Sequence, residues 1–350
     1  MEGTMKGLVK VSKEKGAVLR TDLPIPKIKD NEVLVKVRCA AICGTDQHIF
    51  HWNDWAEERV PVPMVFGHEF SGDVVEVGSS VSGIKVGDRV AGETHIPCGN
   101  CYPCQTGDQH NCENMKIIGV HVPGAFCEYI AVPKECIWLL GKETDYVIGS
   151  MLEPMGVAVH GVMSGHMSVS AKTVLILGCG PIGVMAVGAA HAAGASKVIA
   201  VDIFPEKLSM ANDMGADVLI NTKEKDLIAA VKEETLGRGA DIIIDYTGNV
   251  KLIESTFDCL AKGGRYTFVG LPNNKLSLDL TTAMIYKEAT VNGVTGRRMY
   301  ETWWQCDALI KSGKCDISKV IGGKYQLEEF EQAFSDIDSG KAGKLIFMIQ

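Results

Sequence analysis

The stretch TVLILGCGPIGVMAV, residues 173–187, decides the fold of this 350-residue chain. Its first five residues form a continuous apolar run, which is typical of a strand buried on both faces. The run 178–183, GCGPIG, then gives the pattern G-x-G-x-x-G at the start of a helical segment. A strand, a glycine-rich turn and a helix in this order predict the first β-α unit of a parallel sheet.

The alternation of apolar strand and helix continues beyond this unit. Strands are expected in KVIAVD, ADVLI, ADIIIDYTG and GRYTFVG, with helices at 206–214 and 224–236. Continuous apolar strands that alternate with helices indicate an α/β domain whose doubly wound parallel sheet is of the Rossmann type.

The glycine run also predicts a dinucleotide site. Gly178 makes the tight turn, Gly180 lets the backbone approach a pyrophosphate, and Gly183 lets helix pack on strand. Asp202 ends the next strand, where its carboxylate is expected to accept hydrogen bonds from the adenosine ribose. That carboxylate would repel a 2′-phosphate, so NAD is favoured over NADP, although Lys207 is able to approach such a phosphate. The alternative is an αβ domain that binds no nucleotide.

The first third of the chain has a different pattern. Short strands are expected at 33–37, 72–77 and 86–90, separated by Gly-Ser and Gly-Asp turns. Many short strands with glycine between them indicate a β-rich, barrel-like unit. A length of 350 residues suggests two domains.

Four cysteines, Cys98, Cys101, Cys104 and Cys112, have the spacing C-x2-C-x2-C-x7-C. Four thiolates from one short segment predict a closed, structural zinc site. The alternatives are an iron–sulfur cluster, two disulfides, or four unrelated cysteines.

A second constellation joins Cys43 in ICGTDQH with His68 in GHE. Both are good zinc ligands, and Glu69 and the later Glu153 are candidates for the remaining positions or for outer partners. A His-Glu pair alone is usually a surface or core feature. The zinc hypothesis is supported here because the same chain also carries a predicted nucleotide-binding fold and the four-cysteine metal site.

Composition limits the function classes. The net charge of −8 argues against a nucleic-acid partner, which requires clustered Lys and Arg. The first ten residues, MEGTMKGLVK, hold no apolar stretch of signal-peptide type, and we expect no membrane span. Twelve cysteines without such a segment predict a reducing compartment, and hence a cytoplasmic protein.

These motifs occur in the order found in zinc-dependent medium-chain dehydrogenases of the alcohol dehydrogenase superfamily, which the chain resembles over its whole length. Within that superfamily it resembles the L-threonine 3-dehydrogenases. The runs that carry this narrower resemblance are HIFHWNDWA (48–56), ETHIPCGNCYPC (93–104), CENMKIIGV (112–120) and TGRRMYETWW (295–304).

The resemblance implies a fold, a reaction and an assembly. The fold is a GroES-like β-rich catalytic domain, 1–157 with 297–350, which carries the structural zinc lobe at about 93–115, and a Rossmann NAD-binding domain at 158–296. The reaction is oxidation of the secondary alcohol of L-threonine to 2-amino-3-oxobutanoate, with one catalytic and one structural zinc per subunit. The assembly is a homotetramer.

The resemblance also implies site residues. Thr45 and His48 match a proton relay, and Glu153 matches an acidic residue that assists proton transfer or enters the zinc shell. Trp52, Trp55 and His95 are expected to line the substrate pocket. The cofactor contacts are expected from Gly178, Gly180, Ile182, Gly183, Asp202, Lys207, Val269, Gly270, Leu271, Val294 and Thr295.

Two departures keep a second substrate class open. Val157 stands where threonine dehydrogenases usually carry Asn, and Ile321 to Tyr325 lacks the usual Thr-His. Either is compatible with a dehydrogenase of polyols or vicinal diols, such as sorbitol or 2,3-butanediol. A third hypothesis is a non-catalytic NAD-binding protein, which predicts loss of catalytic ligands that this chain retains.

Overall fold

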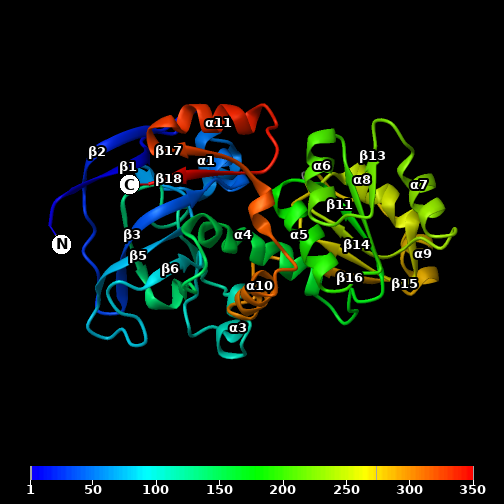
Figure 1. Ribbon diagram of the computed structural model, residues 1–350, viewed down its shortest axis with the longest axis horizontal. Coiled ribbons are helices and arrows are strands. Elements are labelled where there is room, and N and C mark those ends of the chain that lie inside the picture. Colours follow the sequence, from blue (N-terminus) through cyan, green and yellow to red (C-terminus); the bar gives the residue numbers. More distant parts are fainter. Residues whose placement is uncertain (1, 273, 350) are drawn as a thin grey trace. The chain divides into compact units, whose positions relative to one another are not determined.

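A computed structural model describes residues 2–272 and 274–349 of the chain, which divide into two units (Figure 1). Unit 1 comprises residues 1–153 and 321–350, and unit 2 comprises residues 154–320. The division falls within one helix, α4 (Tyr146–Met163). The sequence predicted boundaries after 157 and 296. By its contacts, the segment 297–320, which holds helix α10 (Glu301–Lys311), belongs to unit 2.

Unit 2 is built on a six-stranded parallel sheet in the order β13-β12-β11-β14-β15-β16. This order turns back at β11, as in the doubly wound fold that binds dinucleotides. The strands are β11 (Thr173–Leu177), β12 (Lys197–Asp202), β13 (Val218–Asn221), β14 (Ala240–Asp245), β15 (Leu260–Phe268) and β16 (Thr290–Gly293). The helices are α5 (Pro181–Ala192), α6 (Pro205–Asp213), α7 (Leu227–Glu234), α8 (Val250–Thr256) and α9 (Leu280–Ala283). The predicted Rossmann fold is confirmed.

Burial on both faces explains the continuous apolar strands of unit 2. Leu175 and Ile243 pack into a core with Val231 of α7 and Ile253 of α8. Their neighbour Val174 points to the opposite face and is also fully buried. A sheet covered by helices on both sides cannot place polar side chains at alternate positions, so no alternation appears in the sequence.

The C-terminal end of α4 is held by a buried cation. Arg265 on β15 is 0% exposed and donates hydrogen bonds to the carbonyl oxygens of Ser164, Met167 and Val162, the last two at 2.9 Å. Val162 lies in the last turn of α4, where a carbonyl has no partner within the helix, and Ser164 and Met167 follow just beyond it. Arg265 therefore fastens the end of α4 to the parallel sheet.

Unit 1 is β-rich and holds a sheet in the order β10-β6-β5-β3-β18-β17, with β9 also pairing with β3. These strands are β3 (Glu32–Ala41), β5 (Glu69–Val77), β6 (Arg89–Gly92), β9 (Tyr129–Pro133), β10 (Ile137–Leu139), β17 (Ile321–Gln326) and β18 (Lys344–Met348). A second sheet, β2-β1-β4, consists of β1 (Thr4–Lys10), β2 (Val18–Pro24) and β4 (Met64–Val65), and a small one pairs β7 (His95–Ile96) with β8 (Lys116–Ile117). The helices are α1 (Gly44–His51), α2 (Asp54–Arg59), α3 (Tyr102–Gln105) and α11 (Phe330–Asp338).

The end of the chain completes this sheet. Strand β18 pairs antiparallel with β3, where Ile346 lies opposite Ala41, and parallel with β17 (Figure 1). The core below contains Phe66, Phe126 and Phe334, with the ring of Phe334 stacked on that of Phe50 at 4.2 Å. Unit 1 therefore needs both ends of the chain, and its β-rich character agrees with the prediction.

One predicted strand differs in register. The sequence suggested a strand at 86–90, but β6 begins at Arg89, and Val86 is 62% exposed. Gly87 has a φ of 88°, and Asp88 accepts hydrogen bonds from Lys85 that close a turn at this point. Because that turn uses residues 85–88, the strand starts after it.

Among the residues that the structure describes, no helix is both long and apolar enough to cross a membrane.

Candidate active site and metal centres

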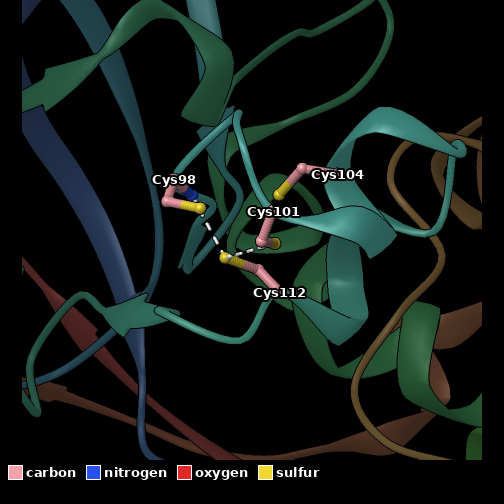
Figure 2. A group of neighbouring side chains, drawn as sticks. All are labelled: Cys98, Cys101, Cys104 and Cys112. Carbon is pink, nitrogen blue, oxygen red and sulfur yellow. Dashed lines mark hydrogen bonds between the residues drawn. The ribbon is translucent and has the colours of Figure 1, made fainter.

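The four cysteines of the lobe converge. Their sulfur atoms all lie within 4.8 Å of one another, as Figure 2 shows for Cys98, Cys101, Cys104 and Cys112. Cys101 is the N-cap of the short helix α3, Cys104 lies within α3, and Cys112 follows a 3-10 turn at Gln109–Asn111. Two tight turns thus bring four thiols to one point.

This geometry fits zinc. A tetrahedral ion with zinc–sulfur bonds of about 2.3 Å separates its sulfurs by about 3.8 Å. The sulfurs of Cys101 and Cys112 are 3.8 Å apart, and both cysteines are free thiols. Backbone N–H groups of Cys98 and Asn114 donate to the sulfur of Cys112 at 3.2 and 3.3 Å. The spacing suits one ion better than a cluster of several irons, whose cysteines stand further apart.

A second group of metal-ligating atoms lies in unit 1. The ligand atoms of Cys43, His68 and Glu69 are within 4.8 Å of one another, and the last two side chains are buried. Cys43 is the N-cap of α1, and Glu69 begins strand β5. Gly67 makes the approach possible, because its φ is 89° and a Cβ there would lie 2.5 Å from the ring of Phe126.

Charge is concentrated around these three residues. Asp46 is 0% exposed, and its carboxylate accepts a hydrogen bond from the backbone N–H of Cys43 at 2.8 Å. Its other oxygen lies 3.8 Å from Nδ1 of His68, and neither of these two atoms makes a hydrogen bond. Burial disfavours the imidazolium, but the charges of Asp46 and Cys43 raise the pKa of His68 to about 10. The anions around His68 therefore favour a positive charge at this point, which either a proton or a metal ion can supply.

A single buried lysine balances part of this charge. Lys344 on β18 donates to Oε1 of Glu69 at 2.6 Å, and its nitrogen is also 2.6 Å from Oε2, without hydrogen-bond geometry. Burial raises the pKa of Glu69, and the charge of Lys344 opposes the rise. Glu153, 5% exposed on α4, is near enough for its charge to raise the pKa of Glu69. The carboxylates of Asp46, Glu69 and Glu153 and the thiol of Cys43 thus surround one lysine. The negative charge that Lys344 does not balance would favour a divalent cation.

The donor set fits zinc. Sulfur, imidazole nitrogen and carboxylate oxygen are its usual ligands, and three protein ligands are typical of a catalytic site. Asp46 places a buried carboxylate 3.8 Å from Nδ1 of His68, too far for a hydrogen bond but close enough for its charge to act on the imidazole. The structure therefore brings together three of the predicted ligands, with Glu153 at the edge of the group.

Helix α1 leads from this site to the surface. Thr45 and His48 stand three residues apart, and so on one face of the helix. Thr45 is half-buried and His48 is exposed. Nδ1 of His48 lies 2.8 Å from the amide nitrogen of Asn53, and its ring centroid is 5.9 Å from that of Trp55.

The other two predicted substrate residues have polar partners of their own. Trp52 donates from Nε1 to Glu57 at 2.5 Å, and the ammonium group of Lys10 lies 5.1 Å from its ring. His95 on β7 lies 2.9 Å from the fully buried Glu93 through Nδ1. Trp55 is therefore the aromatic residue that contacts the predicted relay, while Trp52 and His95 are fixed by other contacts.

In unit 2, the predicted cofactor residues gather at one edge of the sheet. Most lie at or just after the carboxyl ends of parallel strands, which meet at the same edge, while Ile182 and Gly183 begin α5 and Lys207 lies in α6. Gly178 follows β11, Asp202 ends β12, Val269 to Leu271 follow β15, and Val294 and Thr295 follow β16. The N–H of Val294 donates to the carbonyl oxygen of Phe268 at 2.9 Å, which links the last two loops.

The glycine loop has the shape that a dinucleotide needs. A Cβ on Gly183 would lie 1.9 Å from the carbonyl oxygen of Gly178, so only glycine lets α5 pack this closely. A Cβ on Gly180 would meet no atom within 4 Å, which leaves open space before the N-terminus of α5. Asp202 accepts hydrogen bonds from the N–H groups of Cys179, Ile203 and Phe204 at 2.7 to 3.0 Å, which fix its carboxylate beside this space.

Two functional residues were missed by sequence reasoning. Asp46 belongs to the CGTD run, and its position three residues after the N-cap Cys43 was a signal for a carboxylate near the metal. Lys344 had no such signal, because it meets Glu69 only through the pairing of β18 with the rest of the sheet.

Replacing one lobe cysteine should remove one metal ion. We expect Cys112→Ser to lower the zinc content by one equivalent per chain and the melting temperature by roughly 5–10 °C. Elemental analysis and a thermal melt measure both. Cys315→Ser, at a buried cysteine outside the lobe, is the control. Unchanged zinc content in Cys112→Ser would contradict the assignment.

Comparison with known proteins agrees with these sites. Residues 29–142 match the alcohol dehydrogenase GroES-like domain, and residues 181–312 match the zinc-binding dehydrogenase family. L-threonine 3-dehydrogenases from Bacillus subtilis and Pyrococcus furiosus are 45% and 40% identical to the chain. The first match covers 99% of both sequences and the second covers 100% of both.

Solved structures of related dehydrogenases are similar to this chain over almost its whole length. A zinc-binding dehydrogenase from Sinorhizobium meliloti, bound to NADP, has a TM-score of 0.90 and 30% identity over 99% of both chains. A 2R,3R-butanediol dehydrogenase from Bacillus subtilis has a TM-score of 0.89 and 28% identity, and covers 98% of this chain and 99% of its own. The expected fold, a GroES-like domain with a Rossmann domain, is confirmed. The chain belongs to the zinc-binding dehydrogenases of the alcohol dehydrogenase superfamily, in the group of L-threonine 3-dehydrogenases.

Proposed function

We propose that this protein is an L-threonine 3-dehydrogenase. In the reaction, the C3 hydroxyl of L-threonine loses its proton, C3 loses a hydride to NAD, and 2-amino-3-oxobutanoate, NADH and a proton result. The observation that carries the proposal is the group Cys43, His68 and Glu69 in a chain that is 45% identical to an L-threonine 3-dehydrogenase over 99% of its length.

Cys43, His68 and Glu69 would hold the catalytic zinc. Zinc supplies Lewis acidity there, which lowers the pKa of a substrate hydroxyl. The charge of Asp46 would act on the imidazole of His68 from 3.8 Å, and Lys344 would fix the carboxylate of Glu69 by a hydrogen bond. Cys98, Cys101, Cys104 and Cys112 would hold a structural zinc, which has no position open to substrate.

The substrate proton needs a route out. We assign Thr45 to its first transfer and His48 to its release, because α1 carries both on one face from a half-buried to an exposed position. The contacts of His48 with Asn53 and Trp55 keep its ring at the surface end of this face. Glu153 assists, since its carboxylate is buried beside the ligand group.

For the substrate, Trp55 would supply an apolar wall near the relay, with Trp52 and His95 further along the pocket. For the cofactor, the backbone at Gly178, Gly180 and Gly183 would hold the pyrophosphate at the N-terminus of α5. The remaining cofactor contacts are assigned to Ile182, Lys207, Val269, Gly270, Leu271, Val294 and Thr295, which lie at the same sheet edge or beside it.

NAD is the proposed form of the nicotinamide cofactor, whereas the Sinorhizobium relative was solved with NADP. The support is Asp202, whose charge is fixed beside the glycine loop by three backbone hydrogen bonds. Lys207 does not neutralise it by a close contact, because its ammonium group lies over the ring of Phe204 at 4.5 Å. A 2′-phosphate would therefore meet an anion first.

A second candidate function is oxidation of a vicinal diol. It is favoured by the similarity to the 2R,3R-butanediol dehydrogenase and by Val157, which replaces an expected Asn on α4. Both reactions use the same metal and cofactor chemistry, so the substrate alone separates them.

We further propose a cytoplasmic homotetramer. β16 is the last strand of its sheet, and exposed apolar side chains accompany it: Leu280, Ile285, Tyr286 and Val291. An apolar sheet edge is a natural place for subunits to pair. The twelve cysteines are all free, which suits a reducing compartment.

The substrate test compares NADH formation from L-threonine, 2,3-butanediol and sorbitol by absorbance, with zinc-replete protein. We expect kcat/KM for L-threonine to exceed the others by about tenfold or more, a difference of ~1.4 kcal/mol in transition-state binding. Cys43→Ser should lower the activity by more than ~100-fold, because a ligand matters at least as much as an outer partner. Cys39→Ala, at a buried cysteine of β3, is the control. Preference for a diol would move the assignment to the second candidate.

The cofactor test uses Asp202→Gly and Asp202→Asn. Removing the charge should raise the NADP-to-NAD ratio of kcat/KM by roughly tenfold or more, since a close like charge costs several kcal/mol. Asp202→Asn removes the charge but keeps one oxygen, which can still accept from Ile203 and Phe204, and it loses the bond from Cys179. It therefore perturbs the turn less than Asp202→Gly does. An unchanged ratio in both variants would show that other contacts choose the cofactor.

The assembly test is light scattering on the eluted protein. We expect about 150 kDa, four times the chain mass of 37.7 kDa. Val291→Lys should give a smaller particle, because it places a charge on the edge strand. Val86→Lys, at an exposed turn of unit 1, should not. A chain-sized particle for the unmodified protein would refute the tetramer.

A further inference from the structure

A cavity of about 660 Å³ lies in unit 1 and contains none of the metal ligands. Its walls come from the three-stranded sheet β2-β1-β4, from β9, and from the loops before and after them. The volume is within the range of about 300–1,000 Å³ that is usual for small-molecule sites. No role in the proposed reaction uses this cavity.

The floor of the cavity is apolar. Met5, Val9, Val65 and Cys127 form a small hydrophobic cluster there, and each is at most 9% exposed. The thiol of Cys127 donates to the carbonyl oxygen of Tyr129 at 3.1 Å, and burial raises its pKa to about 12. The floor thus holds no charge and suits a hydrocarbon chain, because apolar cavities of this kind exclude water.

The wall continues this apolar surface towards the mouth. Ile96, Ile118 and Val122 also line the cavity, together with several prolines, among them Pro26 and Pro63. Proline side chains are rigid, so ordering them around a ligand costs little conformational entropy. The cavity is formed before any ligand arrives.

The mouth is basic, in contrast to the chain as a whole. Arg20, Lys27, Lys29 and Lys116 line it with a single acid, Glu32, in a protein of net charge −8. Arg20 is paired with Asp22, and Lys29 with Glu32. Lys27 and Lys116 are exposed and have no ion-pair partner among residues 2–272 and 274–349. Two uncompensated cations therefore mark the entrance.

We propose that this cavity binds a medium-chain alkyl carboxylate. The hydrocarbon tail lies on the cluster of Met5, Val9, Val65 and Cys127, and the carboxylate remains at the mouth with Lys27 and Lys116. An apolar interior gives affinity that grows with chain length, and the basic mouth selects an anionic head group over a cationic one.

The site lies close in sequence to the catalytic ligands. Val65, in its floor, precedes His68 by three residues, and Gly124, in its wall, donates from its N–H to the carbonyl oxygen of Val65 at 2.7 Å. A bound chain would contact the strand that leads directly to the metal group.

The first experiment is calorimetric titration of the zinc-loaded protein with dodecanoate, below its micelle concentration. We expect one dodecanoate per chain, bound at least about tenfold more tightly than octanoate, which has four fewer methylenes, and than dodecyltrimethylammonium. Equal binding of the cationic analogue, or no dependence on chain length, would overturn the proposal.

Variants then locate the site. Lys27→Glu with Lys116→Glu should weaken dodecanoate binding at least tenfold, and Val122→Trp should weaken it by filling the cavity. Lys15→Glu with Lys251→Glu makes the same charge change at two exposed positions outside the lining and should leave binding within twofold. Thermal melts check that each variant is folded.

The same experiments distinguish dodecanoate from a second copy of the chain as the occupant of the cavity mouth. If Lys27→Glu with Lys116→Glu splits the assembly in light scattering and dodecanoate does not bind the unmodified protein, a second copy of the chain covers the mouth, and the proposal is wrong. Binding that Val122→Trp leaves unchanged, in folded protein, would also refute it.

Discussion

The buried ion pair of Lys344 and Glu69 is the constraint on which the catalytic half of the molecule depends. Its residues are 275 positions apart, and their side chains are 4% and 0% exposed. Removing one partner of such a pair leaves an uncompensated charge, at a cost of about 3–5 kcal/mol. The pair therefore ties the last strand, β18, to β5, the strand that begins at the candidate ligand Glu69.

The two metal groups of unit 1 differ in what surrounds them. In the cysteine lobe, backbone N–H groups donate to sulfur, and four thiols complete the set. Around Cys43, carboxylates and an imidazole supply mixed donors, and the nearby Asp46 and Glu153 add charge beyond the ligands. A closed all-sulfur set stabilises the fold, whereas a mixed set with three protein ligands leaves space for chemistry. The donor types of the two groups therefore suit different roles for a bound zinc.

Unit 2 shows how a parallel sheet gathers residues that are distant in sequence. Because its strands run in one direction, the loops after β11, β12, β15 and β16 all lie at one edge. Gly178 and Val294 are more than a hundred residues apart and still belong to this edge. Away from this edge, the buried Arg265 of β15 anchors α4 to the same sheet.

The sequence by itself determined the features that are local. The cysteine lobe occupies fifteen residues, and the glycine loop with Asp202 occupies twenty-five, so turn and strand geometry alone brings their atoms together. It also determined the fold class, because continuous apolar strands that alternate with helices are typical of a parallel sheet covered by helices on both faces. Only the tertiary structure decided that Lys344 meets Glu69, that Asp46 stands beside His68, and that the segment 297–320 belongs to unit 2. The physical reason is that contacts between distant segments follow from the order of strands in a sheet, which no local pattern of side chains specifies.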